Sequence, residues 1–284
     1  MPQSIRNLLR EARQALGPAG AEARLEAEIL LGHALSRERS FLHARPEFEP
    51  EADAIARFAA LIERRRVGEP VAYILGEREF WSLPLKVNRD TLIPRPETEL
   101  LVEQALARIP LDAAWYIADL GTGSGAIALA LARERPGCRI VASDVAAGAL
   151  AAARANAAAL DIGNIEFCDG NWFEPLAGKR FNMIVSNPPY IAAGDVHLDQ
   201  ADVAFEPRAA LVGGADGMDA ITAIAAGAPE HLEPGGHLLL EHGYNQAAVV
   251  AATLAKAGFV DVRCYRDLCG HGRVSAASLP ATGA

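Results

Sequence analysis

The residues best suited to chemistry are Asn187-Pro188-Pro189-Tyr190, the NPPY turn, which follows an apolar run at 181–186. The run is typical of a buried strand, and two successive prolines keep the following residues out of a sheet ladder or a helix. A polar amide, fixed backbone carbonyls and an aromatic ring are therefore held at the carboxyl end of a strand, where open α/β sheets bind ligands. Asn-Pro is also an ordinary turn former, so the motif alone leaves a plain turn as an equal alternative.

A glycine loop joins a predicted strand to a predicted helix, and its residues run Asp119-Leu120-Gly121-Thr122-Gly123-Ser124-Gly125. Glycines permit a tight turn and a close approach of a ligand to the backbone. With Ala126, the loop also satisfies the dinucleotide-binding pattern G-x-G-x-x-G/A. Asp144, at the end of the next strand, suits a ribose diol, whether the ligand is a dinucleotide or another cofactor that carries a ribose. The glycine loop by itself leaves the cofactor open.

Asp119, immediately before the glycines, favours a cationic cofactor over one that contains a pyrophosphate. A carboxylate beside a pyrophosphate is repelled, whereas beside a cationic aminoacyl-sulfonium it is attracted. Asn171 and Trp172 follow a third strand, where an amide and an indole can frame an adenine. The structural alternatives are that Asp119 only caps the following turn and that Trp172 belongs to the core.

Strands and helices alternate from residue 115 onward, which predicts a parallel sheet with crossover helices. Strand-like runs occupy 116–120, 139–142, 165–168, 182–186, 237–241 and 259–263, with helices predicted at 125–135, 147–160, 220–226 with its extension, and 244–257. The tail after Ser275 is small and polar, and we expect it to be frayed.

The first 76 residues read as a small helical bundle, followed at 77–93 by a β-hairpin linker. Three helices are predicted there: one capped by Ser4, a second carrying Leu25, Ile29, Leu30 and Ala34, and a third after Pro50. A short fourth helix ends at Gly76. The third helix ends in three consecutive arginines at 64–66, which fit either a solvated helix end or a contact with a partner or RNA.

Composition excludes several classes of protein. The 284 residues are 51% hydrophobic, so a substantial core is possible and global disorder is excluded. The net charge of −9 argues against a broad surface for duplex nucleic acid. No apolar run approaches membrane-spanning length, and the start of the chain lacks the apolar core of a signal peptide. The four cysteines show no ligand spacing, so we expect a cytoplasmic protein with reduced thiols and no metal, even at Cys269-Gly270-His271.

The glycine loop, Asp144 and the NPPY turn together resemble the class I S-adenosylmethionine-dependent methyltransferases that modify planar nitrogens. Further segments resemble the bacterial release-factor glutamine methyltransferases, the PrmC/HemK family, from about residue 5 to 274. These segments are 68–76, Phe80-Trp81, Ile93-Pro94-Arg95-Pro96-Glu97-Thr98-Glu99, 206–211, 213–217, and Asp267-Leu268 with Gly270 and Arg273. The resemblance implies a helical domain at 1–76, the hairpin linker at 77–93, and a Rossmann-like methyltransferase domain at 94–284 with a mostly parallel twisted sheet and helices on both faces.

The resemblance also implies roles for individual residues. Contacts to the methyl donor, S-adenosyl-L-methionine, are expected from Asp119, Gly121, Thr122, Gly123, Ser124, Gly125, Asp144, Trp172 and Asn187. The acceptor glutamine is expected to lie against Asn187, Pro188, Pro189 and Tyr190. In this hypothesis, the Asn187 side-chain oxygen and the Pro188 carbonyl accept the two amide N–H bonds while Tyr190 packs on the amide plane.

The implied substrate is the glutamine of the Gly-Gly-Gln loop in class-1 peptide chain release factors, with the helical domain docking that partner. We expect a monomer that binds neither a membrane nor nucleic acid stably. A ribosomal protein glutamine is the near alternative, because it needs identical chemistry. Adenine N6 methylation is a third, since the same turn can hold an exocyclic amine, although it requires a basic cleft for base flipping. A non-catalytic docking protein is the alternative from another class. Glu206 and Arg208 suit either the cleft or a simple salt bridge.

Overall fold

The computed structural model describes residues 3–17, 20–200 and 202–281. The chain divides into two compact units: Met1–Gly76 with Asp199–Phe205, and Glu77–Leu198 with Glu206–Ala284. The sequence interpretation kept 77–93 as a separate linker and assigned 199–205 to the methyltransferase domain, so the structure groups both segments differently. It joins the hairpin to the second unit and the short segment to the first.

The first unit is helical, with α1 (Ile5–Ala15), α2 (Gly20–Leu35), α3 (Arg39–Ala44), α4 (Ala52–Arg66) and α5 (Val71–Leu75). Ser4 caps α1 as predicted, because its side chain accepts a hydrogen bond from the Asn7 amide at 3.4 Å. Two details differ from the sequence interpretation. Leu25 is 41% exposed, and the buried face of α2 is built mainly from Ala23, Ala27, Leu30, Leu31 and Ala34. The six-residue α3 was not predicted.

The arginine triplet at the end of α4 is engaged in ion pairs inside the first unit. Arg64 pairs with Glu69 at 2.7 Å, and Arg66 pairs with Glu63 at 3.0 Å. Arg65 contacts Glu26 at 2.9 Å and Asp202 at 2.7 Å, and its side chain is only 14% exposed. These pairs favour a structural role for the triplet over an open contact surface.

The second unit begins with an antiparallel hairpin of β1 (Glu77–Phe80) and β2 (Leu83–Lys86). Trp81 and Ser82 form its two-residue turn with φ angles of 53° and 56°, the left-handed conformation that matches the twist of the strands. A short 3₁₀ turn, η1 (Pro96–Thr98), then leads into α6 (Glu99–Leu106).

A seven-stranded sheet forms the centre of this unit, in the order β5-β4-β3-β6-β7-β9-β8. Its strands are β3 (Tyr116–Leu120), β4 (Arg139–Asp144), β5 (Ile165–Asp169), β6 (Phe181–Ser186), β7 (Leu232–Glu241), β8 (Val260–Arg266) and β9 (Gly272–Ser278). The first five strands in this order pair in parallel, whereas β9 runs antiparallel to both of its neighbours. The prediction of a frayed tail after Ser275 is wrong for residues 276–278, which lie in β9 with Ala276 and Ala277 buried, and its last part, 282–284, lies outside the described residues.

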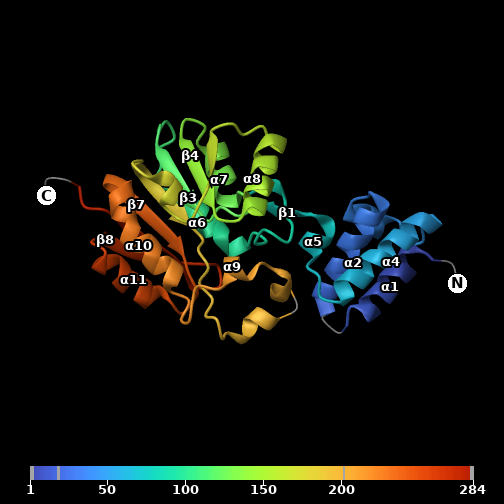
Figure 1. Ribbon diagram of the computed structural model, residues 1–284. Helices are drawn as coiled ribbons and strands as arrows, with labels where there is room; N and C mark the ends of the chain where they lie inside the picture. The colour runs from blue at the N-terminus through green and yellow to red at the C-terminus, as the bar shows by residue number, and fades with distance from the viewer. Residues whose placement is uncertain (1–2, 18–19, 201, 282–284) are drawn as a thin grey trace. The chain divides into compact units, whose positions relative to one another are not determined.

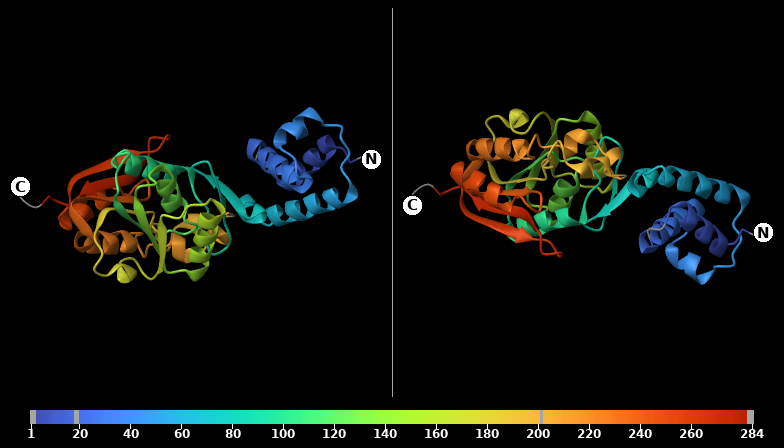
Figure 2. Two further views of the ribbon diagram at one scale, coloured as in Figure 1. Left: turned by 90° about the horizontal axis from the view of Figure 1, so that it is seen from above. Right: turned by 90° about the horizontal axis from the view of Figure 1, so that it is seen from below.

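Helices cover both faces of the sheet (Figures 1 and 2). One buried cluster joins α6, α7 (Ala126–Glu134) and the end of α8 (Ala147–Ala159) to the strands and the hairpin. The other joins α10 (Asp219–His231) and α11 (Ala247–Lys256) to the opposite face. The short elements η2 (Glu174–Leu176), η3 (Val196–Asp199), η4 (Val203–Phe205) and α9 (Arg208–Leu211) lie in the connections.

The predicted α/β fold with a mostly parallel sheet is confirmed. Side chains alternate between the two faces along each strand, so Ile117 joins the α6 and α7 side while Ala118 and Leu120 join the α10 and α11 side. Among the described residues, no helix is long and apolar enough to cross a membrane.

Candidate active site

The strand order reverses between β3 and β6, and both predicted motifs follow these two strands. The register aligns Leu120 with Ser186 and Ser186 with Leu240. Gly121 of the glycine loop, Asn187 of the NPPY turn and Glu241 are consequently the next residues along three neighbouring parallel strands. This is the topological switch point at which open α/β sheets bind ligands.

The glycine loop is shaped by its backbone. Gly121, Gly123 and Gly125 all have positive φ, at 70°, 57° and 85°. The amides of Gly121 and Thr122 both donate to the Ser143 carbonyl oxygen at 2.9 Å, which ties the loop to β4. At Gly125 a methyl group would lie 3.0 Å from the Leu129 side chain, so only glycine lets the loop pack against the helices there.

Asp119 lies beneath the loop and is completely buried. Its Oδ2 accepts a hydrogen bond from the Thr122 hydroxyl at 2.7 Å, so the turn-bracing role considered for this residue is present. Its Oδ1 has no hydrogen-bond partner among the described residues. Burial raises the pKa of Asp119 to about 7, with a further contribution from Asp144 and opposition from the Thr122 hydroxyl and the Ala128 amide. A buried carboxyl with an unused oxygen at the floor of a loop is suited to a cationic ligand.

Asp144 occupies the predicted place at the end of β4 and fixes the loop as well. Its Oδ2 accepts from the Gly123 amide at 2.8 Å, and its Oδ1 accepts from the Ala146 amide at 2.9 Å. Each carboxylate oxygen retains a further lone pair for a ligand hydroxyl.

Trp172 belongs partly to the core and partly to the cavity wall. The indole packs against the second hydrophobic cluster and also lines the cavity, and a methyl group on Gly121 would lie 3.5 Å from its Cζ3. Trp172 has a φ of 45°, an uncommon conformation for a bulky residue that is typical of functional sites.

The NPPY turn is held from several sides. The Asn187 Nδ2 donates to the Thr98 hydroxyl at 3.2 Å. Behind the turn, the Gln246 Nε2 donates to the Tyr190 carbonyl at 3.0 Å, and a methyl group on Gly217 would lie 2.1 Å from that same oxygen. No described residue donates a hydrogen bond to the Asn187 side-chain oxygen or to the Pro188 carbonyl. Both predicted acceptors are thus unused.

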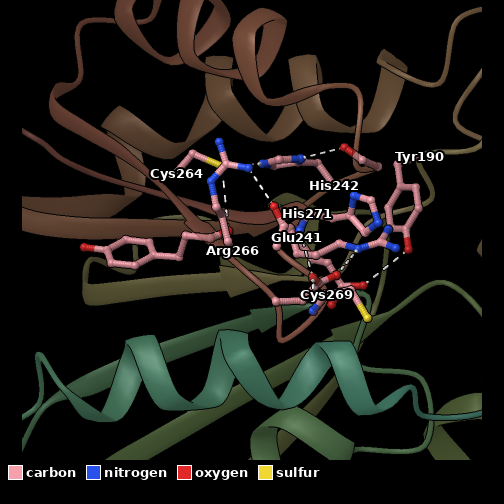
Figure 3. Close-up of polar contacts among 12 residues, drawn as sticks. Tyr190, Glu241, His242, Cys264, Arg266, Cys269 and His271 are labelled. Carbon is pink, nitrogen blue, oxygen red and sulfur yellow. Dashed lines mark hydrogen bonds and ion pairs between the residues drawn. The ribbon is translucent and has the colours of Figure 1, made fainter.

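The Tyr190 side chain turns toward a buried polar cluster. Its hydroxyl donates to the Glu241 Oε1 at 3.3 Å (Figure 3). Burial, together with the neighbouring Glu241 carboxylate, raises the pKa of Tyr190 above its usual range.

A cavity of about 250 Å³ joins the two motifs. Six residues predicted for the site line it, namely Gly121, Gly123, Asp144, Trp172, Asn187 and Pro189. Asp119, Thr122, Ser124, Gly125, Pro188 and Tyr190 support the walls without lining the cavity. Ser124 acts through its carbonyl, which accepts from the Asn156 side chain at 2.9 Å.

Sequence reasoning missed several contributors. The further lining residues are Asp90, Leu92, Val145, Ala146, Ala149, Gly170, Pro207, Ala209 and Ala210, beside Asn171, which the sequence analysis had named with Trp172. Glu206 anchors the segment that contains Pro207, because this buried carboxylate pairs with Arg95 and accepts from the Ile93 amide at 3.0 Å. The sequence had left two alternatives for Glu206, shaping the cleft or forming a salt bridge with Arg208, and the structure pairs it with Arg95.

The residues present fit a sulfonium methyl donor. The unpartnered Asp119 Oδ1 suits its positive charge, the Asp144 carboxylate a ribose, and the Trp172 indole a planar base. Position 123 faces open space, since nothing lies within 4 Å of a methyl group placed there. Within the described ranges, no group of three or more His, Cys, Asp and Glu residues could hold a metal ion.

The fold and the site define a class I methyltransferase. Residues 7–76 match the PrmC N-terminal domain and residues 96–211 match the methyltransferase small domain. A methyltransferase structure from Pyrococcus furiosus shares the fold, with a TM-score of 0.53, 19% identity, and coverage of 70% of this chain and 89% of that one.

The chain belongs to the release factor glutamine methyltransferase family. It is 51% identical to the release factor glutamine methyltransferase of Xylella fastidiosa strain Temecula1 over 257 residues, 90% of this chain and 94% of that protein. It is 50% identical to that of Escherichia coli K12 over 267 residues, 94% of this chain and 96% of that protein. The predicted resemblance is confirmed.

Proposed function

We propose that this protein transfers a methyl group from S-adenosyl-L-methionine to the side-chain amide nitrogen of the glutamine in the Gly-Gly-Gln loop of class-1 peptide chain release factors. The observation that carries the proposal is the position of Asn187. It lines the same cavity as Gly121 and Asp144, and no described residue donates a hydrogen bond to its amide oxygen. The family relatives supply the substrate class.

The NPPY turn orients the acceptor. An amide nitrogen is a poor nucleophile because its lone pair is delocalised, and the sulfonium of the donor supplies a strong electrophile. The Asn187 side-chain oxygen and the Pro188 carbonyl accept the two N–H bonds of the glutamine amide. These hydrogen bonds hold the nitrogen at the cavity and stabilise the positive charge that develops on it. Tyr190 packs on the amide plane.

No base is required before transfer. The nitrogen becomes acidic as it gains the methyl group, so its proton can leave afterwards to water. The donor side is held by Asp119 at the cationic end, Asp144 at the ribose and Trp172 at the base, with the backbone of residues 121–125 in close approach.

Mass spectrometry distinguishes the possible substrates. The chain is incubated with the donor and, separately, a purified class-1 release factor, ribosomal protein and duplex DNA. We expect one added methyl group on the glutamine of the Gly-Gly-Gln loop. Methylation of ribosomal protein or of adenine, with none on the factor, would refute the proposal. Calorimetric binding of the donor provides the control, since a binding module that lacked the site would give no heat.

We further propose that the helical domain at 1–76 docks the release factor away from the active site. Deleting residues 1–76 should reduce activity on the whole factor more than activity on a short Gly-Gly-Gln peptide. Donor affinity of the truncated chain shows whether its methyltransferase domain is still folded. Equal losses on factor and peptide, with donor binding intact, would exclude docking.

A further inference from the structure

Glu241 is a buried carboxyl that neither the donor pocket nor the proposed transfer step uses. It ends β7, is 1% exposed, and does not line the cavity. The register nevertheless sets it beside Asn187, because Leu240 is paired with Ser186 on the neighbouring strand. Its side chain shares the sheet face of Leu239, which is the face that α6 covers.

Two contacts connect Glu241 to the NPPY turn. The Tyr190 hydroxyl donates to its Oε1 at 3.3 Å. The Thr98 hydroxyl, at the end of η1 and only 4% exposed, lies near enough to the carboxyl to lower its pKa as a hydrogen-bonding neighbour. Thr98 in turn accepts the Asn187 Nδ2 at 3.2 Å. Glu241 therefore reaches both the first and the last residue of the turn.

The hydroxyl of Thr98 gives this chain of contacts a direction. A hydroxyl carries one proton, and the Glu241 carboxyl, once it is ionised above its pKa of about 7, can only accept. When Thr98 donates to Glu241, its oxygen can only accept from Asn187, so the NH₂ end of the Asn187 amide must point toward Thr98. The oxygen end then points away from Thr98, as an acceptor for the substrate.

A purely structural role accounts poorly for this carboxyl. Its Oε2 has no hydrogen-bond partner among the described residues. Arg273 lies close enough to affect the Glu241 carboxyl, but its Nε is bound to Asp267 at 3.0 Å. A buried carboxyl that is only partly satisfied costs stability relative to an apolar side chain of similar size.

We propose that Glu241 is a positioning residue of the acceptor site: through Thr98 it sets which end of the Asn187 amide faces the substrate, and through the Tyr190 hydroxyl it fixes the aromatic ring. This inference rests on the proposed function. Glu241 touches neither the donor nor the acceptor, and it acts on the reaction only through these two side chains.

Substitutions that preserve shape test the proposal. In Glu241→Gln the new amide can donate to the Thr98 oxygen. The Thr98 proton is then free to bond to the Asn187 oxygen, so the Asn187 side-chain amide can adopt the reversed orientation. With the full-length chain and whole release factor, we expect kcat to fall about 10- to 100-fold. The Kd for the donor, measured by calorimetry, should stay within about threefold of wild type, a change of about 0.6 kcal/mol.

Thr98 offers a conservative rescue. Thr98→Val removes the hydroxyl at nearly constant volume and should lower kcat by a similar factor, whereas Thr98→Ser keeps the hydroxyl and should retain most activity. The double variant Glu241→Gln/Thr98→Val should lose much less than the product of the single losses, because both changes break one chain of contacts. Glu166→Gln, at the start of β5 and paired with Lys179 at 2.8 Å, is the matched control and should behave as wild type.

Three results would overturn the inference: wild-type kcat in Glu241→Gln, equal impairment of Thr98→Ser and Thr98→Val, or a donor Kd that worsens in parallel with kcat as it would after general loss of folding. The wild-type chain separates this inference from the function on which it rests. If the wild-type chain methylates no release factor, the proposed function fails; if it does and Glu241→Gln matches it, only the positioning role fails.

Discussion

Asp119 and Glu241 are buried carboxyls in similar positions on opposite sides of the switch point between β3 and β6. Both carboxyls are buried at the carboxyl ends of parallel strands, on the sheet face covered by α6 and α7. Each has one oxygen without a partner among the described residues, and burial raises the pKa of each to about 7. Asp119 lies behind the glycine loop and Glu241 behind the NPPY turn.

The two sides differ in what their carboxyls support. The glycine loop is built from backbone: positive φ angles, amides bound to Ser143, and one amide bound to Asp144. The NPPY turn depends on side chains from distant segments, namely Thr98, Gln246 and Glu241. Changes on the donor side should therefore act on donor affinity and stability, and changes on the acceptor side should act on turnover.

The largest expected effect is on the acceptor side. Asn187→Ala removes one of the two proposed acceptors for the glutamine amide. We expect kcat to fall by at least about 100-fold, the scale of losing one preorganised polar contact to the reacting group. Donor affinity, measured by calorimetry, should change only a few-fold. Near-wild-type turnover would refute the assignment of Asn187.

The matching change on the donor side is Asp119→Asn, which removes the charge at constant shape. A hydrogen bond to a charged group contributes about 1.5–3 kcal/mol, so the Kd for S-adenosylmethionine should rise about 10- to 100-fold. The product S-adenosylhomocysteine lacks the sulfonium charge and should lose less affinity. At saturating donor, kcat should stay near the wild-type value. If Asp119→Asn bound the donor normally but turned over slowly, the assignment of Asp119 to the donor side would be wrong.

The glycine loop and the NPPY turn could be predicted because each is a local pattern. Glycines and paired prolines restrict the backbone wherever they occur, and an apolar run before each motif indicates the strand that presents it. Asp119 was identified for the same reason, since it adjoins the loop it supports.

Glu241 could not be identified in this way. Its role depends on the register of β7 against β6 and on η1 bringing Thr98 close to the carboxyl. Neither relation can be read from neighbouring residues. Thr98 was quoted within a family motif, but no sequence pattern connects it to Glu241.

The missed elements of the fold have similar causes. Strand β9 buries Ser275, Ala276 and Ala277, whose small side chains give little hydrophobic signal. The position of β9 between β7 and β8 in the sheet supplies the burial that its own residues do not indicate. Helix α3 spans only six residues, too few for a helical period to stand out.

A smaller effect tests whether the donor side is built from backbone. Gly125→Ala places an alanine in a left-handed conformation, which costs a non-glycine residue about 1–2 kcal/mol. It also places a methyl group 3.0 Å from Leu129 and 3.2 Å from Ala153. Gly123→Ala carries the left-handed cost with its methyl group in open space. Unfolding by denaturant should show the larger loss of stability for Gly125→Ala, by about 1 kcal/mol or more from overpacking. Equal losses would mean that packing against the helices contributes nothing.

The smallest effect concerns pH and the buried Asp119 carboxyl. Its pKa rises from the ordinary 3.8 to about 7 in the folded protein, so the folded chain binds this proton more tightly than the unfolded chain. The resulting stability is fully present below pH 3.8 and is lost as the pH rises through about 7. Asp119→Asn stays neutral throughout. Without donor, its melting temperature relative to wild type should therefore increase between about pH 5 and pH 7 and level off above.

The expected slope is about 1.4 kcal/mol per pH unit between the two pKa values, or about 3–6 °C per pH unit for a domain of this size. Glu241→Gln should give the same trend from its own raised pKa, since that carboxyl is buried equally well. Saturating donor distinguishes the two residues. A bound cation stabilises ionised Asp119 and should flatten or reverse the pH trend of the Asp119→Asn comparison, while leaving that of Glu241→Gln largely unchanged. If donor flattened both trends equally, the separation of donor and acceptor sides would be wrong.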